Sequence, residues 1–113
     1  MRKDVMELSD ALRHQIRESL KPLHPEKVIV FGSYGRGDAT EDSDLDVLIV
    51  ERDIPDHTTE YLRLREVIGS VGVGVDLLLL PLNEFTRRRE WASSPVYWAA
   101  REGLVLYDSE TTA

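Results

Sequence analysis

The chain has 113 residues, of which 42% are hydrophobic and 31% charged, and its formal net charge is −7. This length predicts a single domain, residues 1–113, and the composition is typical of a globular protein. No run of about 18 apolar residues is present and the first residues are charged, so we expect neither a membrane span nor a secretory leader. The absence of cysteine excludes disulfides and thiolate zinc sites, which is consistent with a cytoplasmic protein.

The charge is unevenly distributed along the chain. Residues 38–60 contain nine acidic residues and one basic residue, so this segment carries −8 and the remainder +1. Like charges this close together raise one another's pKa unless a cation offsets them. The lack of a basic face argues against nucleic acid as the bound partner. The acidic segment therefore needs a cause other than solubility.

The first half of the chain alternates helix and strand patterns. Residues 3–21 place apolar side chains at helical spacing, and a proline ends the helix that they predict. A short strand is predicted over 27–31, followed by a turn-rich stretch over 32–43 with three glycines. Residues 45–50 are strongly β-biased and apolar on both faces after Asp46, which is typical of a central strand covered on both sides.

The second half continues the alternation. A helix is predicted over 58–71 and a buried strand over 75–80. Two short helices follow: the one over 83–92 begins with an asparagine as its N-cap, and the one over 95–101 has proline in its first turn. A last edge strand is predicted over 104–107. The pattern predicts an α/β domain with a sheet of about four strands flanked by helices.

The residues with the clearest chemistry lie at the start of the predicted strand 45–50. Asp44 and Asp46 are two positions apart, so both side chains point to the same face of the strand. Hard divalent cations such as Mg²⁺ bind carboxylate oxygens together with waters and substrate phosphates. The pair is a candidate platform for one or two metal ions in phosphoryl or nucleotidyl transfer. The alternative is that Asp-x-Asp is a loop or strand start without a ligand.

Two further features favour the metal site. Gly32 and Ser33 follow a buried strand, and free backbone N–H groups at such a turn, with the serine hydroxyl, can hold a triphosphate. Asp76 is a lone acidic residue on the apolar strand 75–80, where an unpaired carboxylate on a face shared with leucines would be costly. If this strand lies beside the first, Asp76 completes a site of three carboxylates.

Together these residues resemble the signature of the DNA polymerase β-like nucleotidyltransferase superfamily. Gly32-Ser33, ten residues and then Asp44-x-Asp46 match its motif, and Asp76 falls on the later strand where the family has its third carboxylate. The chain is similar in particular to the minimal nucleotidyltransferases (MNT), the short stand-alone branch.

The resemblance covers roughly residues 5–107, with the motif core at 31–50 and 74–80. It implies a small nucleotidyltransferase fold with a mixed sheet of about four strands, and an active enzyme.

The resemblance also implies a mechanism. Two Mg²⁺ ions lie between the three aspartates and the triphosphate of an NTP, usually ATP, and Gly32 and Ser33 hold its β- and γ-phosphates. Asp76 is the candidate to accept a proton from an acceptor hydroxyl, which attacks the α-phosphorus and releases pyrophosphate. Arg36, in the same turn, either reaches a phosphate or forms a salt bridge with Asp38 or Asp42.

The chain is too short to carry the acceptor-binding domain of larger superfamily members, so we expect a dimer or a protein partner to bring the acceptor. Chains of this length resemble the antitoxins of HEPN–MNT toxin–antitoxin pairs, which transfer AMP to a tyrosine of the toxin, an RNase. A cognate HEPN protein is therefore the expected partner. Two alternatives remain open: an antitoxin that only binds, and a homodimer that modifies a small hydroxylated molecule.

Other residues have both a structural and a functional interpretation. Ser43 either supports the metal ligands or satisfies the loop backbone. The basic run 87–89 either faces solvent or docks an acidic partner. Trp91, Tyr97 and Trp98 either pack the last helices or form a partner interface. The three histidines share no metal-ligand spacing, and we assign them no role.

Overall fold

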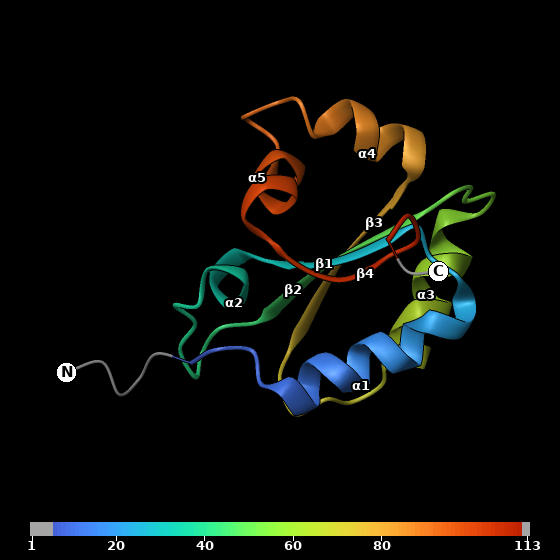
Figure 1. Ribbon diagram of the computed structural model, residues 1–113. Coiled ribbons are helices and arrows are strands. Elements are labelled where there is room, and N and C mark those ends of the chain that lie inside the picture. Colours follow the sequence, from blue (N-terminus) through green and yellow to red (C-terminus); the bar gives the residue numbers. More distant parts are fainter. Residues whose placement is uncertain (1–5, 112–113) are drawn as a thin grey trace.

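The computed structural model of the protein describes residues 6–111. Its elements in chain order are α1 (Asp10–Leu20), the 3-10 turn η1 (Lys21–Leu23), β1 (Lys27–Phe31), α2 (Gly32–Arg36), β2 (Leu45–Glu51), α3 (His57–Ile68), β3 (Val75–Pro81), α4 (Leu82–Arg88), α5 (Pro95–Glu102) and β4 (Leu104–Asp108). Figure 1 shows a single sheet with helices on both of its faces. The predicted α/β class and the sheet of four strands are confirmed. The helices between residues 6 and 111 are all too short or too polar to span a bilayer.

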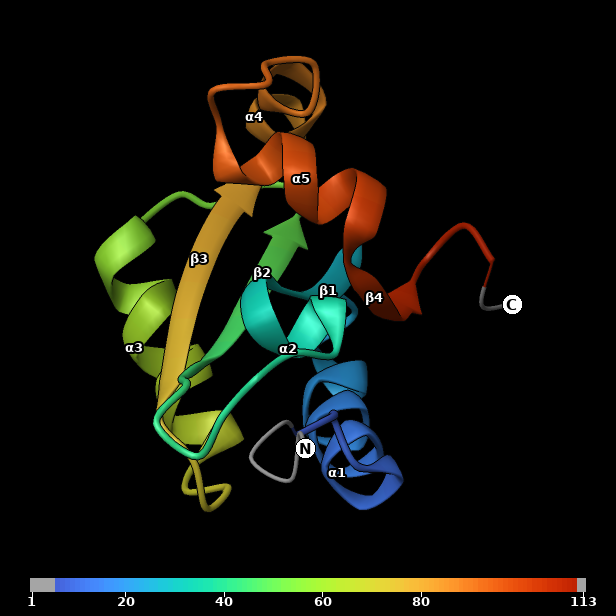
Figure 2. The same cartoon turned by 90° about the vertical axis from the view of Figure 1, so that its left-hand side faces the viewer.

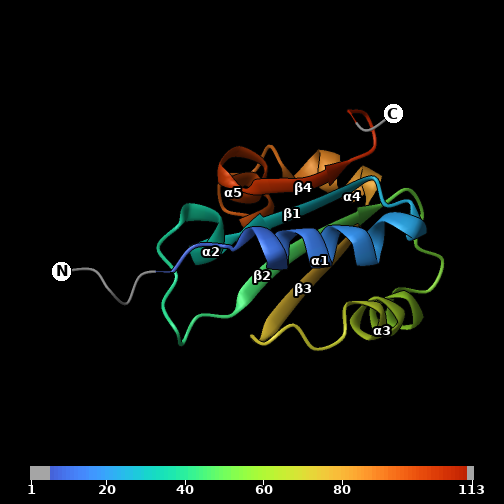
Figure 3. The ribbon, with the colours of Figure 1, turned by 60° about the horizontal axis from the view of Figure 1, so that its bottom comes forward.

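The sheet is mixed, with the strand order β3-β2-β1-β4. β2 and β3 are parallel neighbours, and α3 provides the crossover that parallel strands need. β1 is antiparallel to both β2 and β4. β2 is therefore a central strand, as predicted, while β3 and β4 form the two edges (Figure 3).

Side chains of α3 form hydrogen bonds with backbone carbonyls on the edge of β3 that faces away from β2. The N–H of Leu45 in β2 donates to the carbonyl of Gly74, so the carbonyls of the alternate residues Val75 and Leu79 face away from β2. Arg65 donates to the carbonyl of Val75 at 2.5 Å. His57 Nε2 donates to the carbonyl of Leu79 at 3.0 Å.

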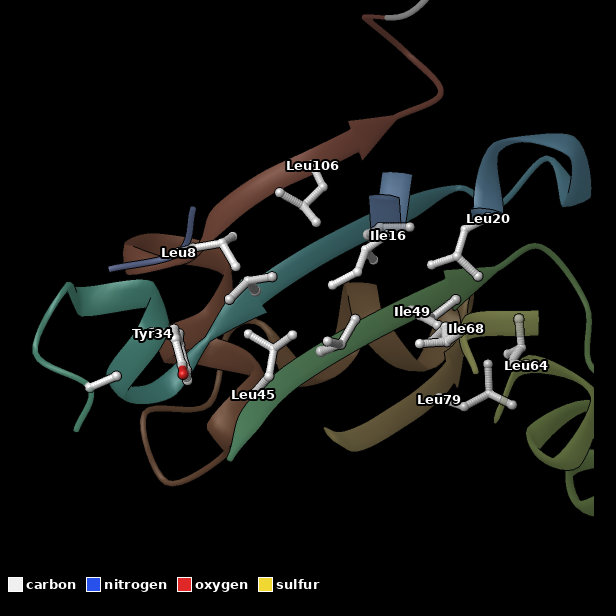
Figure 4. Packing of buried hydrophobic residues seen from close by; sticks show 14 residues of the cluster. Leu8, Ile16, Leu20, Tyr34, Leu45, Ile49, Leu64, Ile68, Leu79 and Leu106 are labelled. Atoms are coloured by element: carbon white, nitrogen blue, oxygen red, sulfur yellow. The ribbon is translucent and has the colours of Figure 1, made fainter. Parts of the chain in front are cut away.

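The core lies on both sides of β2, because successive side chains of a strand point to opposite faces. Ile49 packs on the face that α1 and α3 cover, in one cluster with Ile16 and Leu64 (Figure 4). Leu48 packs on the other face, in a cluster with Phe85 of α4. The domain therefore has three layers, and β2 is inaccessible to solvent over most of its length.

The first helix is shorter than the predicted 3–21. It begins only after Ser9, whose hydroxyl caps the first turn by accepting a backbone hydrogen bond of 3.1 Å. Met6 lies before this cap and pairs with Ala39 through a backbone hydrogen bond of 2.6 Å. The predicted start was therefore wrong, and its residues 3–5 lie outside the described part of the chain.

Three other predicted boundaries change for local reasons. The helix predicted to reach residue 71 ends before Gly69, whose φ of +65° leaves the helical conformation. In the helix predicted over 83–92, the N-cap residue is Pro81, which has an extended backbone, and not the asparagine. This helix ends at Arg88. The predicted turn-rich stretch 32–43 contains the short helix α2.

Candidate active site

The parallel pairing of β2 and β3 brings the predicted carboxylates to one end of the sheet. Asp46 and Asp76 are direct register partners, and Asp44 comes just before β2 at the same end. By the alternation of the strands, Asp46 and Asp76 share their face with Leu48 and with α4. Figure 2 shows α4 and α5 over the far ends of β2 and β3, and the short helix α2 beside β2 on the same face.

Two glycines lie directly against these carboxylates. Gly32, which follows β1, has φ +68°, and a Cβ at this position would overlap the carboxylate of Asp46. A Cβ on Gly74 would lie 2.5 Å from Oδ1 of Asp44. Bare backbone at both positions therefore makes room for the acidic side chains. Gly74 was not among the sequence candidates, because its contact with Asp44 exists only once β3 pairs with β2.

Gly32 and Ser33 form the start of α2, immediately beside Asp46. The first N–H groups of a helix have no acceptor inside the helix, so they are available to an anion. The carbonyl of Ser33 is occupied, because it accepts from Asp38 N–H at 2.9 Å. This turn thus offers hydrogen-bond donors close to a group of carboxylates.

Negative charge accumulates at Asp46. Partial burial raises the pKa of Asp46, the nearby charges of Asp76 and Asp44 raise it further, and Arg36 lowers it in part. A cation at this end of the sheet would relieve the repulsion among these carboxylates. Carboxylate oxygens are also the ligands that Mg²⁺ prefers, so the donor set fits this ion.

The side chains of the three aspartates do not converge on a single point. Across residues 6–111, no three acidic or histidine side chains converge closely enough to enclose one metal ion. The pairing of β2 with β3 places the three aspartates at the same end of the sheet. Their side chains would have to rotate to converge on one metal ion. Asp76 is also exposed, so the predicted cost of burying it was wrong: its carboxylate lies where water reaches it.

Arg36 forms the ion pair with Asp38 that was its structural interpretation, and its charge also acts on Asp46. Its Nε lies 3.3 Å from Oδ2 of Asp38, and both side chains are exposed. Its positive charge also lowers the pKa of Asp46 in part. Ser43 accepts a hydrogen bond from Thr40 N–H at 2.9 Å, which confirms its role in the loop backbone.

Two hollows on the described surface lie away from the carboxylates. One of about 460 Å³ is lined by Glu51, Glu60 and Arg63 among others, and one of about 500 Å³ by His57 and Arg88 among others. Both lie toward the opposite end of β2 and β3. The carboxylates occupy an open stretch of sheet, so an occupant there would be enclosed on few sides.

The chain is similar to known proteins over the part that contains these residues. The chain matches the family described as nucleotidyltransferase domain over residues 13–97, a range that contains the glycine turn and all three aspartates. A Methanocaldococcus jannaschii protein, by name a candidate protein adenylyltransferase, is 31% identical over 105 residues, which are 93% of this chain and 96% of that protein. The protein adenylyltransferase MntA of Thermococcus cleftensis is 34% identical over 74 residues, 65% of this chain and 74% of MntA.

Solved structures show the same architecture. A structure described as a candidate minimal nucleotidyltransferase has a TM-score of 0.51 and 31% identity, and the match covers 83% of this chain and 88% of that one. A candidate nucleotidyltransferase from Sulfolobus solfataricus has a TM-score of 0.59 over 89% of this chain and 84% of its own, with 20% identity, which supports the fold alone.

Proposed function

Because the chain belongs to the family of nucleotidyltransferase domains, we propose that it is a magnesium-dependent enzyme that transfers AMP from ATP to a hydroxyl group of a protein. One observation carries the proposal: Asp46 and Asp76 are register partners on adjacent strands, beside the Gly32 turn. Carboxylates next to free backbone N–H groups are suited to a metal-bound triphosphate.

The residues divide into two groups by the part of ATP that they would contact. Asp44, Asp46 and Asp76 would hold Mg²⁺, which when bound stabilises the negative charge that develops on the reacting phosphates. The N–H groups at Gly32 and Ser33 would bind the β- and γ-phosphates, with Arg36 as a further contact. This arrangement would direct the α-phosphorus toward the carboxylates.

The reaction is an in-line substitution at the α-phosphorus. The acceptor oxygen forms a bond to the α-phosphorus, the bond from that phosphorus to the bridging oxygen breaks, and pyrophosphate leaves. Asp76 would take the proton of the acceptor hydroxyl, since it is exposed to an incoming substrate and adjacent to Asp46.

The acceptor that we propose is a tyrosine of a cognate HEPN RNase toxin, which the modification would neutralise. Two observations support a protein acceptor: the names of the relatives, which describe protein adenylyltransferases, and the resemblance of the motif to MNT antitoxins. The chain would then act as an antitoxin in the cytoplasm, with ATP as its donor.

Co-expression tests this function. The product of the neighbouring gene, expected to be a HEPN protein, is produced with the wild-type chain or with Asp44→Asn/Asp46→Asn, and its intact mass is measured. We expect one or more added adenylyl groups with the wild type and none with the double variant. An unmodified partner that both versions hold and silence would contradict catalysis and leave an antitoxin that only binds. Transfer to a small hydroxylated molecule in its place would contradict the protein acceptor.

A further inference from the structure

Both tryptophans of the chain lie in the segment of the last two helices, where the indole of Trp98 is bonded to the carbonyl of Ala92, the residue after Trp91. Trp91 follows α4 and Trp98 lies in α5, and the two residues are 46% and 49% exposed. We call the surface formed by Arg87, Trp91, Tyr97, Trp98 and Arg101 the aromatic–arginine surface. Large aromatic side chains in contact with water are unfavourable, and Trp, Tyr and Arg dominate the binding energy of protein interfaces.

These aromatic rings are held in fixed positions although they are exposed. Trp98 Nε1 donates to the carbonyl of Ala92 at 3.0 Å, and its ring meets Tyr97 edge-on with centroids 4.9 Å apart. The guanidinium of Arg101 lies 3.8 Å from the centroid of the Tyr97 ring, and that of Arg87 lies 4.7 Å from the centroid of a Trp91 ring. A surface ordered in advance loses little conformational entropy when a partner binds.

The charge of this surface is concentrated in one arginine. Arg87 and Arg88 both form ion pairs with Glu84, and Arg89 lies 4.0 Å from Glu90. Arg101 donates to a backbone carbonyl at 3.2 Å, and within residues 6–111 no carboxylate lies within ion-pair distance of it. A carboxylate of a partner would therefore complement Arg101.

The aromatic–arginine surface adjoins the candidate active site. Trp98 lines a small hollow of about 20 Å³ together with Gly32 and Arg36, the turn that we assign to phosphate binding. Figure 2 shows α5 next to α2 on the same face of the sheet. A protein segment bound across Trp98 would thus lie beside the proposed ATP site.

We propose that the aromatic–arginine surface docks an acidic segment of the acceptor protein and so brings its hydroxyl to the carboxylates. This proposal rests on the proposed function and names how that substrate is recognised. Nucleic acid fits the surface less well, because binding to phosphates needs several free cations, and the chain has a net charge of −7 with an acidic segment at residues 38–60.

A defined probe tests the docking directly. We would use a fluorescently labelled copolymer of glutamate and tyrosine, which carries both the acidic groups and the acceptor hydroxyl, with a copolymer of lysine and tyrosine as the comparison. The net charge of −7 should repel the acidic copolymer unless a local site binds it. We expect saturable binding of the acidic copolymer that weakens with salt, and a change in tryptophan fluorescence, because both tryptophans lie on the surface.

Variants locate the binding. Arg101→Gln and Trp98→Ala should each weaken binding of the acidic copolymer at least tenfold, as measured by fluorescence anisotropy. The matched control is Leu62→Ala/Arg52→Ala, which removes an apolar side chain of α3 that is 61% exposed and an exposed arginine after β2 that pairs with Glu26. Circular dichroism checks that each variant is folded, and Arg101→Lys, which keeps the positive charge, should recover part of the affinity.

The outcomes separate docking from catalysis. Binding that depends on Arg101 would support docking whether or not AMP is transferred to the copolymer, because the co-expression experiment tests the proposed function separately. AMP transfer that is equal for both copolymers and unchanged in Arg101→Gln would support the function and overturn docking. Absence of binding by the acidic copolymer, equal binding by the control variant and Arg101→Gln, or displacement by a shorter single-stranded RNA at lower concentration would each overturn the proposal.

Discussion

The backbone of Gly32 lies directly against the carboxylate of Asp46, so the turn after β1 and the start of β2 occupy adjoining space with no side chain between them. This contact couples the two parts of the motif, which the sequence separates by a loop. Any group larger than hydrogen on Gly32 would move the carboxylate, the turn, or both.

Replacing Gly32 by alanine should therefore affect both stability and activity. Its φ of +68° disfavours any side chain by about 1–2 kcal/mol, and the new Cβ would also displace Asp46. Gly37→Ala is the matched control, because its φ is +80° and nothing lies within 4 Å of the added Cβ. Urea unfolding should show both variants destabilised, whereas ATP binding by calorimetry should fail only in Gly32→Ala. Equal loss of ATP binding in the two variants would refute the role of the contact.

Gly74→Ala isolates the second glycine contact without unfavourable backbone torsion. The new Cβ would lie 2.5 Å from Oδ1 of Asp44, and this exposed carboxylate can rotate away. We expect the free energy of unfolding to change by less than about 1 kcal/mol, while AMP transfer falls at least tenfold because a metal ligand has moved. Ser70→Ala, in the preceding loop, serves as the control. Full activity in Gly74→Ala would show that the position of Asp44 is unimportant.

The pair Glu51 and Glu60 predicts a dependence of stability on pH. Burial, a hydrogen bond with Glu60 and the charge of Glu60 raise the pKa of Glu51 to about 7. A hydrogen bond from Arg63 lowers the pKa of Glu60, so the shared proton resides on Glu51. The folded state then binds more protons than the unfolded state between the ordinary pKa of glutamate and about 7, and stability is lost as pH rises through that range.

Glu51→Gln should remove this dependence. Because Glu51 is only partly buried, solvent screening reduces the effect to about 1 kcal/mol, measured as the difference in unfolding free energy between about pH 5.5 and about pH 8. The variant should be more stable than wild type at the higher pH. Glu66→Gln, which alters an exposed glutamate on α3, should leave the wild-type profile unchanged. An identical profile for Glu51→Gln and wild type would be inconsistent with a proton held at Glu51.

The ion pair between Lys27 and Asp108 should stabilise the β1–β4 edge of the sheet. The two residues are register partners, and Nζ lies 2.9 Å from Oδ2 with both side chains largely buried. Burial tends to raise the pKa of Asp108, but the bonds from Lys27 and from Glu110 N–H lower it overall, so this stabilisation is lost as pH falls through the folded-state pKa.

Asp108→Asn should therefore reduce the free energy of unfolding by about 1 kcal/mol at neutral pH, and by less in acid. Glu18→Gln breaks the exposed pair with Arg17, in which Nε and Oε2 are 3.7 Å apart, and should have almost no effect. A loss for Asp108→Asn that is independent of pH would contradict the electrostatic explanation.

Most of the fold can be predicted from the sequence, because the local pattern of apolar residues agrees with the burial that the structure shows. The run over 45–50 is apolar on both faces after Asp46, and the structure places it as an interior strand with helices on each side. Helix boundaries were less accurate, because they depend on single contacts such as the Ser9 cap and the pairing of Met6 with Ala39.

The residues of the candidate site could be predicted from the sequence, but their exposure and their contacts could be predicted less well. The spacing of Gly32, Asp44 and Asp46 is visible in the sequence, whereas the exposure of Asp76 depends on how far α4 and α5 extend over the sheet. The Gly74–Asp44 contact likewise depends on the register of β2 with β3. Such features arise from tertiary structure and leave no local pattern.

The hydrogen bonds from α3 to the outer carbonyls of β3 have a consequence for the behaviour of the protein at high concentration. An apolar strand at the border of a sheet is a template on which another chain can form fibrils. Arg65 and His57 occupy the carbonyls of Val75 and Leu79, so an approaching strand would first have to break these bonds. Helix α3, which connects the strands that carry Asp46 and Asp76, thus also protects this edge of the sheet against aggregation.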